Sequence, residues 1–325
     1  MKVLVTGAAG MIGQKLTDRL ATEAQLGRKT IEQITLFDVV EATAPIDAAF
    51  SVVTESGDLR DADVVEKLTA ASPDVVFHLA AIVSGEAEKD FEKGYGINLD
   101  GTRNLLEAIR AASLNPRFVF ASSIAVFGAP FPDAIGDEFF CTPLTSYGTQ
   151  KAICELLVSD YSRRGILDGI SIRLPTICVR PGKPNAAASG FFSNIIREPL
   201  AGEPAVLPVS EDVQHWHASP RAAIGFMKHA ATIDSQKLGN RRAITMPGLA
   251  VTVAEQIAAL RDVAGDAVVA RIRREPDPFT QQIVAGWPRN FDATRAIELG
   301  FQADASFADI IRAHIEDELG GNIRS

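Results

Sequence analysis

The sequence predicts an α/β protein with a doubly wound parallel sheet of the Rossmann type and a smaller C-terminal substrate-binding lid. Short apolar segments, several of them rich in β-branched residues, alternate with amphipathic stretches through the first half of the chain. A glycine-rich turn follows the first apolar segment, and prolines interrupt the second half. Strands that are apolar on both faces are typical of a parallel sheet covered by helices, so the alternation indicates successive βα units.

The first half accounts for the sheet and the helices that cover it. Expected strands lie at residues 2–5, 33–37, 51–54, 75–79, 117–121 and 169–174. Between them, apolar residues recur at helical spacing over residues 13–26, 61–70, 98–112 and 147–164. Sheets of this kind bind ligands at the carboxyl ends of their strands, which is where we expect the functional residues.

The second half has a different character. Six prolines fall between residues 180 and 220, and they are followed by an expected helix at about 220–232 and a strand at about 242–246. Further helices are expected at 253–264 and 306–318. We interpret residues 1–176 as a dinucleotide-binding domain to which residues 220–247 return. Residues 177–219 and 248–325 would then form the lid.

Composition and charge exclude several classes of protein. With 46% hydrophobic and 22% charged residues, the 325-residue chain is neither disordered nor fibrous. Its formal charge of −9 argues against a nucleic-acid partner. Three cysteines without CxxC spacing and five scattered histidines predict no disulfide framework and no metal site. The longest apolar stretch, residues 75–83, is far below the roughly 20 residues of a membrane span, so we expect a cytoplasmic protein.

The first motif is the turn Thr6-Gly7-Ala8-Ala9-Gly10-Met11-Ile12-Gly13, which joins the first expected strand to the first helix. Glycines at these positions permit a tight turn, close approach of a pyrophosphate to backbone amides, and close packing of the helix on the strand. The helix N-terminus favours negative charge. The spacing is GxxGxxG rather than GxGxxG, but the flanking strand and helix favour dinucleotide binding over a bare glycine turn.

Asp38 ends the second long strand, about 25 residues after the glycine turn. A carboxylate there can accept hydrogen bonds from both hydroxyls of an adenosine ribose, and it would repel a 2′-phosphate. Two valines follow it, with no arginine beside them. The sequence therefore favours NAD over NADP as the cofactor.

Further motifs follow in a fixed order along the chain. They are Gly57-Asp58-Leu59, His78-Leu79-Ala80-Ala81, Asn98-Leu99-Asp100-Gly101-Thr102, Ala121-Ser122-Ser123-Ile124-Ala125-Val126-Phe127-Gly128 and Ser146-Tyr147-Gly148-Thr149-Gln150-Lys151. Together with the glycine turn, this order resembles the extended short-chain dehydrogenase/reductases, the NAD-dependent epimerase/dehydratase family, over nearly the whole chain. The resemblance implies that Ser123, Tyr147 and Lys151 are catalytic. It implies cofactor contacts from Gly7, Gly10, Met11, Ile12, Gly13, Asp38, Asp58, Leu59, Leu79, Ala80, Ala81, Asn98, Tyr147, Lys151 and Pro175.

The chemistry of Tyr147 and Lys151 can also be argued from their spacing. Residues four apart on a helix share one face. An ammonium near a phenol favours the phenolate and lowers its pKa, so that the tyrosine can take a proton from an alcohol. Ser123, expected near the end of a strand, could hydrogen-bond the same substrate oxygen. We expect Lys151 also to hold the nicotinamide ribose.

Two departures from the family pattern bear on the substrate. Phe127 stands where the family usually has tyrosine, and residues 175–182 replace its asparagine-bearing stretch. Residues 174–182, 185–199 and 215–220 look most like the family members that oxidise a four-carbon sugar acid. This resemblance implies oxidation of a small 2-hydroxy sugar acid such as D-erythronate at C2. Ser123 and Tyr147 would then contact the reacting oxygen, and Arg180 or Arg197 the carboxylate.

Two other interpretations remain. A nucleotide-sugar epimerase or dehydratase would use the same three catalytic residues on a tightly held cofactor and return the hydride. A non-catalytic dinucleotide sensor could keep the glycine turn and Asp38, but it would need no Tyr-x-x-x-Lys pair. The expected partners are a small-molecule substrate and a second copy of the chain in a homodimer.

Overall fold

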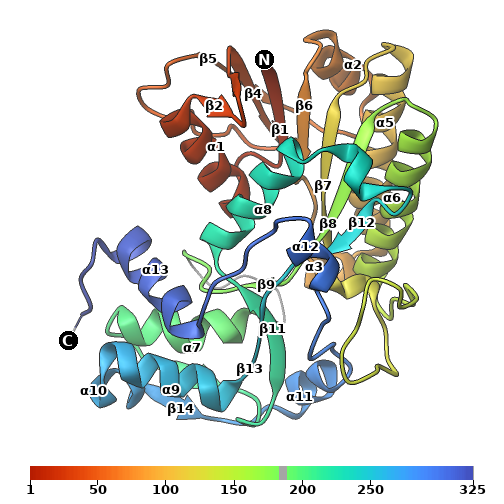
Figure 1. Ribbon diagram of the computed structural model, residues 1–325. Helices are drawn as coiled ribbons and strands as arrows, with labels where there is room; N and C mark the ends of the chain where they lie inside the picture. The colour runs from red at the N-terminus through yellow and green to blue at the C-terminus, as the bar shows by residue number, and fades with distance from the viewer. Residues whose placement is uncertain (183–188, 325) are drawn as a thin grey trace.

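A seven-stranded parallel sheet organises the protein in the computed structural model, which describes residues 1–182 and 189–324 (Figure 1). The strand order is β12-β8-β7-β6-β1-β4-β5, and every neighbouring pair is parallel. This confirms the predicted fold class. In chain order the strands are β1 (Lys2–Thr6), β4 (Gln33–Asp38), β5 (Ser51–Ser56), β6 (Val75–His78), β7 (Arg117–Ser123), β8 (Asp168–Leu174) and β12 (Ala243–Thr245).

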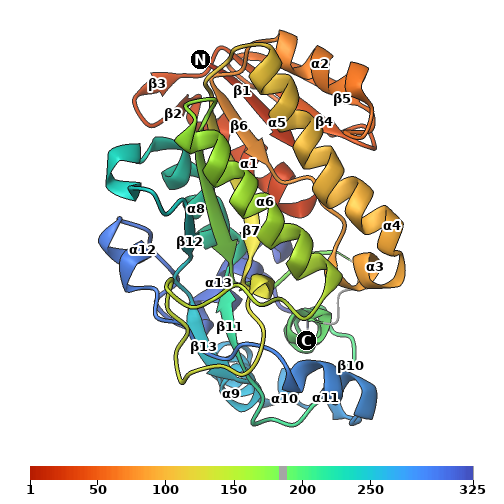
Figure 2. The same cartoon turned by 90° about the vertical axis from the view of Figure 1, so that its right-hand side faces the viewer.

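Helices cover both faces of this sheet because its central strands alternate apolar side chains between two cores. Val3 and Val5 of β1 join one apolar core with α1 (Met11–Glu23) and α8 (Pro220–Thr232). Leu4 belongs to the opposite core. The helices of that second face, side by side in Figure 2, are α2 (Ala62–Ala70), α5 (Gly101–Ala111) and α6 (Ser146–Arg163).

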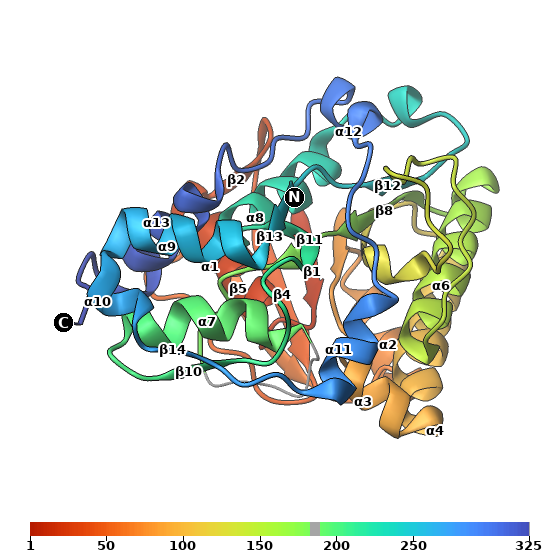
Figure 3. The same cartoon turned by 90° about the horizontal axis from the view of Figure 1, so that it is seen from below.

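A smaller unit with its own apolar core lies below the sheet in Figure 1. Its strands are β9 (Thr176–Ile177), β10 (Ala205–Leu207), β11 (Gln214–Ala218), β13 (Leu249–Thr252) and β14 (Ile272–Arg274). Its helices are α7 (Gly190–Leu200), α9 (Val253–Ala264), α10 (Asp266–Val269), α11 (Pro278–Ala285) and α13 (Phe307–Leu319). Figure 3 shows four of them, α7, α9, α10 and α13, grouped on one side with α11 apart from them. Sequence analysis found α9 and α13 but not α7, because Pro199 lies in its last turn.

Short elements connect these layers. They are β2 (Gln25–Leu26), β3 (Lys29–Thr30), α3 (Ser84–Lys89), α4 (Phe91–Gly94), a π-helical segment (Tyr95–Asp100), two 3₁₀ turns (Ile124–Val126 and Ser235–Leu238) and α12 (Thr294–Glu298). The helix expected from residue 98 therefore begins as a π-helix and becomes α-helical at Gly101. Among the described residues, none of the helices combines the length and the hydropathy needed to cross a bilayer.

Ion pairs join the last helix to the sheet layer. Glu318 of α13 pairs with Lys15 of α1, and Asp317 pairs with Arg221 of α8. α13 also packs on α9 of the smaller unit. The C-terminal helix thus fixes the smaller unit against the helices that follow β1 and β11.

Buried histidines make the fold sensitive to acid. Burial lowers the pKa of His78 to about 3 and that of His215 and His314 to about 4, because a charged ring is disfavoured away from water. In the unfolded chain these rings titrate near 6.5. As pH falls below that value, the unfolded chain takes up protons that the folded chain does not, so stability is lost from about pH 6.5 down to about pH 3, where His78 titrates in the folded chain.

His314 allows this effect to be measured at one site. Both of its ring nitrogens are buried without a hydrogen-bond partner among the described residues. We expect His314→Leu to preserve or raise the free energy of unfolding at pH 7.5, since no hydrogen bond is lost. Between pH 7.5 and 5.0 the variant should lose roughly 1–2 kcal/mol less than the wild type. Urea unfolding at both pH values measures this, and identical losses would contradict it.

Candidate active site and dinucleotide cavity

A cavity of about 340 Å³ lies at the carboxyl ends of β1, β4 and β6. It is the position where a doubly wound sheet binds its ligand. Eight residues singled out from sequence line it: Gly7, Gly10, Asp38, Asp58, Leu59, Leu79, Ala80 and Ala81. The lining also includes Ala9, Phe37, Val39, Val40, Ile82 and Ile97, which sequence analysis did not assign although they adjoin motif residues.

The glycine turn brings β1 and α1 close to the end of β6. Gly7 has a φ of +76°, and a Cβ atom there would lie 2.6 Å from the Ala80 backbone nitrogen. A Cβ on Gly13 would lie 2.3 Å from the Gly7 carbonyl oxygen. Both positions therefore require glycine. The first helical hydrogen bond runs from Gln14 N to Gly10 O, which leaves the amides of Met11, Ile12 and Gly13 as helix-start donors for an anion.

Asp38 is fixed at the cavity wall before any ligand binds. Its carboxylate accepts hydrogen bonds from the backbone amides of Ala9 at 2.9 Å and Val39 at 2.7 Å. No Lys or Arg side chain lines this cavity among the described residues. A bare ribose suits this wall, whereas a 2′-phosphate would meet a carboxylate without a compensating cation. This wall of the cavity thus suits the adenosine ribose of NAD rather than that of NADP.

Asp58 lines the cavity but is paired with a neighbouring arginine, whereas Asn98 is not among the lining residues. Arg60 donates to the Asp58 carboxylate from Nε at 2.9 Å and from Nη2 at 2.6 Å, and this pairing lowers the pKa of Asp58. Asn98 is buried, accepts from the Ile82 amide and donates to Gln150 Oε1. Asn98 therefore supports the segment after β6 and does not line the cavity.

Tyr147 and Lys151 lie in the first two turns of α6, which begins with Thr145 as its N-cap. A Cβ atom on Gly148 would lie 2.1 Å from the Ala125 carbonyl oxygen, so α6 sits directly against the turn after Ser123. Lys151 is buried, and its Nζ donates to the Ala121 carbonyl at 2.8 Å. The same nitrogen lies 5.7 Å from the centre of the Tyr147 ring. The three expected catalytic residues thus lie together, Ser123 at the last position of β7 and Tyr147 and Lys151 in the first two turns of α6.

Burial and charge act in opposite directions on these groups. Burial raises the pKa of Tyr147, while a hydrogen bond with Ser123 and the positive charge of Arg180 lower it. Burial also lowers the pKa of Lys151 to about 8. The expected lowering of the phenol pKa by Lys151, whose Nζ lies 5.7 Å from the ring centre, stays a prediction. Arg180 is a second cation, and its charge lowers the pKa of Tyr147.

The two arginines considered for a substrate carboxylate have different surroundings. Arg197 is paired with Glu198 at 2.5 Å, and it donates to the carbonyl oxygen of Arg180 at 2.8 Å. Arg180 donates to the Ile177 carbonyl and to the Ser189 hydroxyl, each at 3.0 Å. It has no carboxylate partner among the described residues. Arg180 is thus the arginine with an uncompensated charge, and Arg197 holds its backbone.

Pro175 and the two histidines of β11, His215 and His217, are buried. Pro175 directly follows β8. His215 contacts the Thr176 hydroxyl and the Pro288 carbonyl, and the ring of His217 contacts Gln256. The first four residues of the stretch 185–199 lie outside the described residues.

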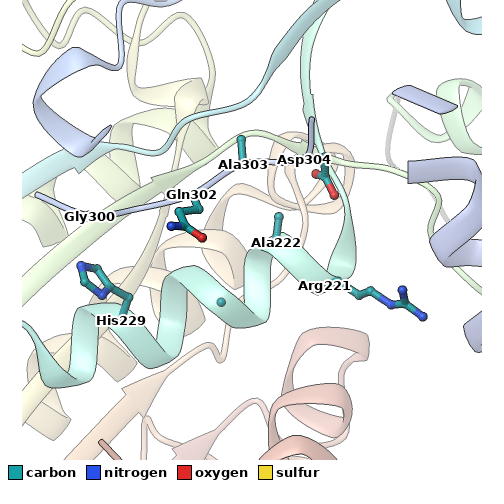
Figure 4. Close-up of a pocket in the computed structure, with 8 residues that line it drawn as sticks. Arg221, Ala222, His229, Gly300, Gln302, Ala303 and Asp304 are labelled. Atoms are coloured by element: carbon teal, nitrogen blue, oxygen red, sulfur yellow. The ribbon is translucent and has the colours of Figure 1, made fainter. Parts of the chain in front are cut away.

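A larger hollow of about 520 Å³ lies elsewhere, between α8 and residues 300–304 (Figure 4). His229, Gln302 and Asp304 are among its lining residues, and in Figure 4 the Arg221 side chain extends away from the hollow. None of the motif residues lines it. We therefore locate the candidate cofactor site at the smaller cavity, which is lined by the glycine turn, Asp38 and residues of the motifs at 57–59 and 78–81. Ser123, Tyr147 and Lys151 are not among its lining residues.

Comparisons with known proteins agree with this geometry. Residues 3–217 match the family described as "NAD dependent epimerase/dehydratase family". D-erythronate dehydrogenase of Cupriavidus necator is 48% identical over 98% of both chains. D-erythronate dehydrogenase of Haemophilus influenzae is 44% identical over 98% of this chain and 100% of the relative. A solved structure described as a nucleoside-diphosphate-sugar epimerase from Agrobacterium tumefaciens is 62% identical, with a TM-score of 0.98. The match covers 100% of this chain and 96% of the other.

The position of Asp38 predicts the cofactor preference. We expect the wild type to have a higher kcat/KM with NAD than with NADP, because the carboxylate repels a 2′-phosphate. Asp38→Ala should narrow this preference mainly through the KM for the cofactor, since the ribose is remote from the reacting carbon. Steady-state kinetics with both cofactors test it, with Asp18→Ala, an exposed carboxylate on α1, as the matched control. Equal or better kcat/KM with NADP in the wild type would refute it.

The site also predicts what loss of the Tyr147 hydroxyl does. Tyr147→Phe should lower kcat by roughly 10²- to 10⁴-fold, the range of general acid–base catalysis, while NAD still binds. Turnover and calorimetric NAD binding are measured on the same preparation. Lys151→Ala should impair both. Near-native turnover of Tyr147→Phe would mean that another group accepts the proton.

Proposed function

Because this chain belongs to the NAD-dependent epimerase/dehydratase family, we propose that it oxidises D-erythronate at C2 to the 2-keto acid. The chain is an oxidoreductase and its cofactor is NAD, as the sequence predicted. The finer assignment of substrate and reacting carbon is the proposal. Two full-length relatives that carry the name D-erythronate dehydrogenase support it.

NAD, when bound, supplies the hydride acceptor. Tyr147 accepts the proton of the substrate hydroxyl, and Ser123 hydrogen-bonds the same oxygen as it becomes a carbonyl. Lys151, anchored to the Ala121 carbonyl through one of its three N–H bonds, has two more with which to hold the nicotinamide ribose. Asp38 holds the adenosine ribose, and the amides at the start of α1 hold the pyrophosphate.

The observation that carries the proposal is the charge of Arg180, which has no carboxylate partner among the described residues and which lowers the pKa of Tyr147. Burial lowers the pKa of Arg180, which means that its charged form lacks part of its hydration. A carboxylate next to the reacting carbon would restore that lost stabilisation with two parallel hydrogen bonds. An anionic 2-hydroxy acid therefore matches this site better than a neutral alcohol.

A nucleotide-sugar epimerase is the second candidate, since the 62% identical solved structure is described as one. Arg180 could then contact a diphosphate instead. A non-catalytic dinucleotide sensor is disfavoured because Tyr147, Lys151 and Ser123 are brought together. The expected homodimer and cytoplasmic location stay predictions.

The absorbance of NADH separates the candidates. We expect D-erythronate to reduce NAD stoichiometrically and to give a 2-keto acid, which is identified by mass spectrometry. An epimerase would give no net change in absorbance. The proposal is abandoned if no four- to six-carbon aldonate reduces NAD and UDP- or dTDP-sugars bind with micromolar affinity in calorimetry.

A substitution of Arg180 tests the carboxylate contact. Arg180→Met should raise the KM for D-erythronate by one to two orders of magnitude, corresponding to roughly 1.5–3 kcal/mol for a hydrogen bond to a charged group. The KM for NAD should stay within about twofold, since Arg180 does not line the dinucleotide cavity. The matched control is Arg261→Met, because Arg261 of α9 is exposed and forms an ion pair with Asp266 of α10. An unchanged KM for D-erythronate would remove Arg180 from the substrate site.

A further inference from the structure

A buried ion pair lies one helical turn beyond Lys151. The Glu155 carboxylate of α6 accepts from the Ser122 hydroxyl at 2.5 Å and from Arg173 Nε and Nη2 at 2.9 and 2.8 Å. The side chains of Glu155 and Arg173 are 5% and 6% exposed. Arg173 is a charged residue within the strand expected at 169–174, but no spacing in the sequence identifies the carboxylate that it meets.

This carboxylate connects the three elements that carry the catalytic end of the sheet. Ser122 lies in β7 next to Ser123, and Arg173 lies opposite Ser122 on the neighbouring strand β8. Arg173 is also stacked on the Phe127 ring, 4.8 Å from its centre. Two successive residues of β7 are therefore tied to α6, Ala121 through Lys151 and Ser122 through Glu155.

The buried face of α6 explains why such ties are needed. It consists of Gly148, Gln150, Lys151, Cys154, Glu155 and Val158, of which three have strongly polar side chains. Apolar contacts are non-directional, so they fix the separation of a helix from a sheet better than its rotation or its shift along the strands. Charge-assisted hydrogen bonds have defined directions and short lengths. These polar bonds therefore restrict the rotation of α6 and its shift along β7 and β8.

We propose that Glu155, held by Ser122 and Arg173, is a positioning residue that sets the placement of Tyr147 and Lys151 relative to Ser123. The proposal rests on the catalytic roles proposed above for those three residues. Glu155 contacts none of the reacting atoms and acts through the helix that carries Tyr147. A shift of about 1 Å in such a group can cost on the order of 10²-fold in rate.

Glu155 also acts on Lys151 through its charge. The titratable groups facing Lys151 are Tyr147, Cys154 and Glu155 of α6 and His78 of β6. Burial lowers the pKa of Lys151, while Cys154 and Glu155 raise it. Burial raises the pKa of the Cys154 thiol to about 11, so near neutral pH the negative charge beside Lys151 is that of the Glu155 carboxylate. His78 adds no charge near neutral pH, because its own pKa is about 3. Neutralising Glu155 should therefore make Lys151 lose its proton at a lower pH.

The first test removes one bond and leaves the ion pair intact. Ser122→Ala should lower kcat by roughly tenfold, while the KM for NAD stays within about twofold. The matched control is Ser171→Ala on β8, a buried serine whose hydroxyl has no partner among the described residues. We expect Ser171→Ala to retain wild-type kcat with a similar melting temperature. Equal kcat in the two variants, or equal loss in both, overturns the positioning role.

The second test follows the pH dependence. The side chain introduced by Glu155→Gln can still accept the Ser122 hydrogen bond. In this variant the alkaline limb of the kcat/KM profile should lie at lower pH than in the wild type, with both profiles measured well below the melting temperatures. A role in stability alone would leave that limb in place, and an unmoved limb overturns the electrostatic part. If Glu155→Gln does not fold, Ser122→Ala decides.

Failure of this inference differs from failure of the proposed function. An inactive Tyr147→Phe together with a fully active Ser122→Ala rejects the positioning role and keeps the catalytic assignment. An active Tyr147→Phe rejects the catalytic assignment and with it the basis of the positioning role.

Discussion

The burial of a single ammonium group is the constraint that shapes the catalytic edge of this sheet. Lys151 is 3% exposed, and loss of hydration lowers its pKa to about 8. The protein offsets part of this loss with the Ala121 carbonyl, the face of the Phe120 ring and the charge of Glu155 one turn away. Burial keeps His78 neutral beside Lys151. The Thr102 hydroxyl donates to the Asn98 carbonyl, so it accepts from His78 Nε2. Nδ1 of the same tautomer accepts from the Thr6 hydroxyl.

The substrate end repeats this pattern with a second partly desolvated cation, but its supports come from the smaller unit. The Arg180 amide donates to the Ser193 hydroxyl of α7, and its carbonyl accepts from Arg197 of the same helix. The position of Arg180 therefore depends on α7 and on the core that holds it, whereas Lys151 depends only on the sheet and α6. The two cations are thus positioned by different parts of the protein, Lys151 by the sheet layer and Arg180 by the smaller unit.

The sheet, the glycine turn and Asp38 were predictable because their signals are local: strands apolar on both faces, a glycine at a left-handed position and a carboxylate at a strand end. α7 and β11 were not, since a proline in one and three aromatic residues in the other hide their periodicity. Choosing between Arg180 and Arg197 requires knowing that Glu198 and the Arg180 carbonyl already occupy Arg197. The partnership of Glu155 with Arg173 likewise depends on contacts between distant segments, which no spacing in the sequence encodes.

The electrostatics of the site also indicate why both cations are needed for proton removal. In the ligand-free protein, Arg180 and Ser123 lower the pKa of a phenol that burial raises. Under the proposed chemistry, a substrate carboxylate pairs with Arg180 and cancels most of its effect on Tyr147. Lys151, whose Nζ lies 5.7 Å from the Tyr147 ring centre, then remains as the nearby cation, and Cys154 and Glu155 oppose the lowering of its pKa by burial. Under this proposed chemistry Arg180 prepares the site for an anion, and we expect Lys151 to supply the cationic support of the Tyr147 phenolate once that anion is bound.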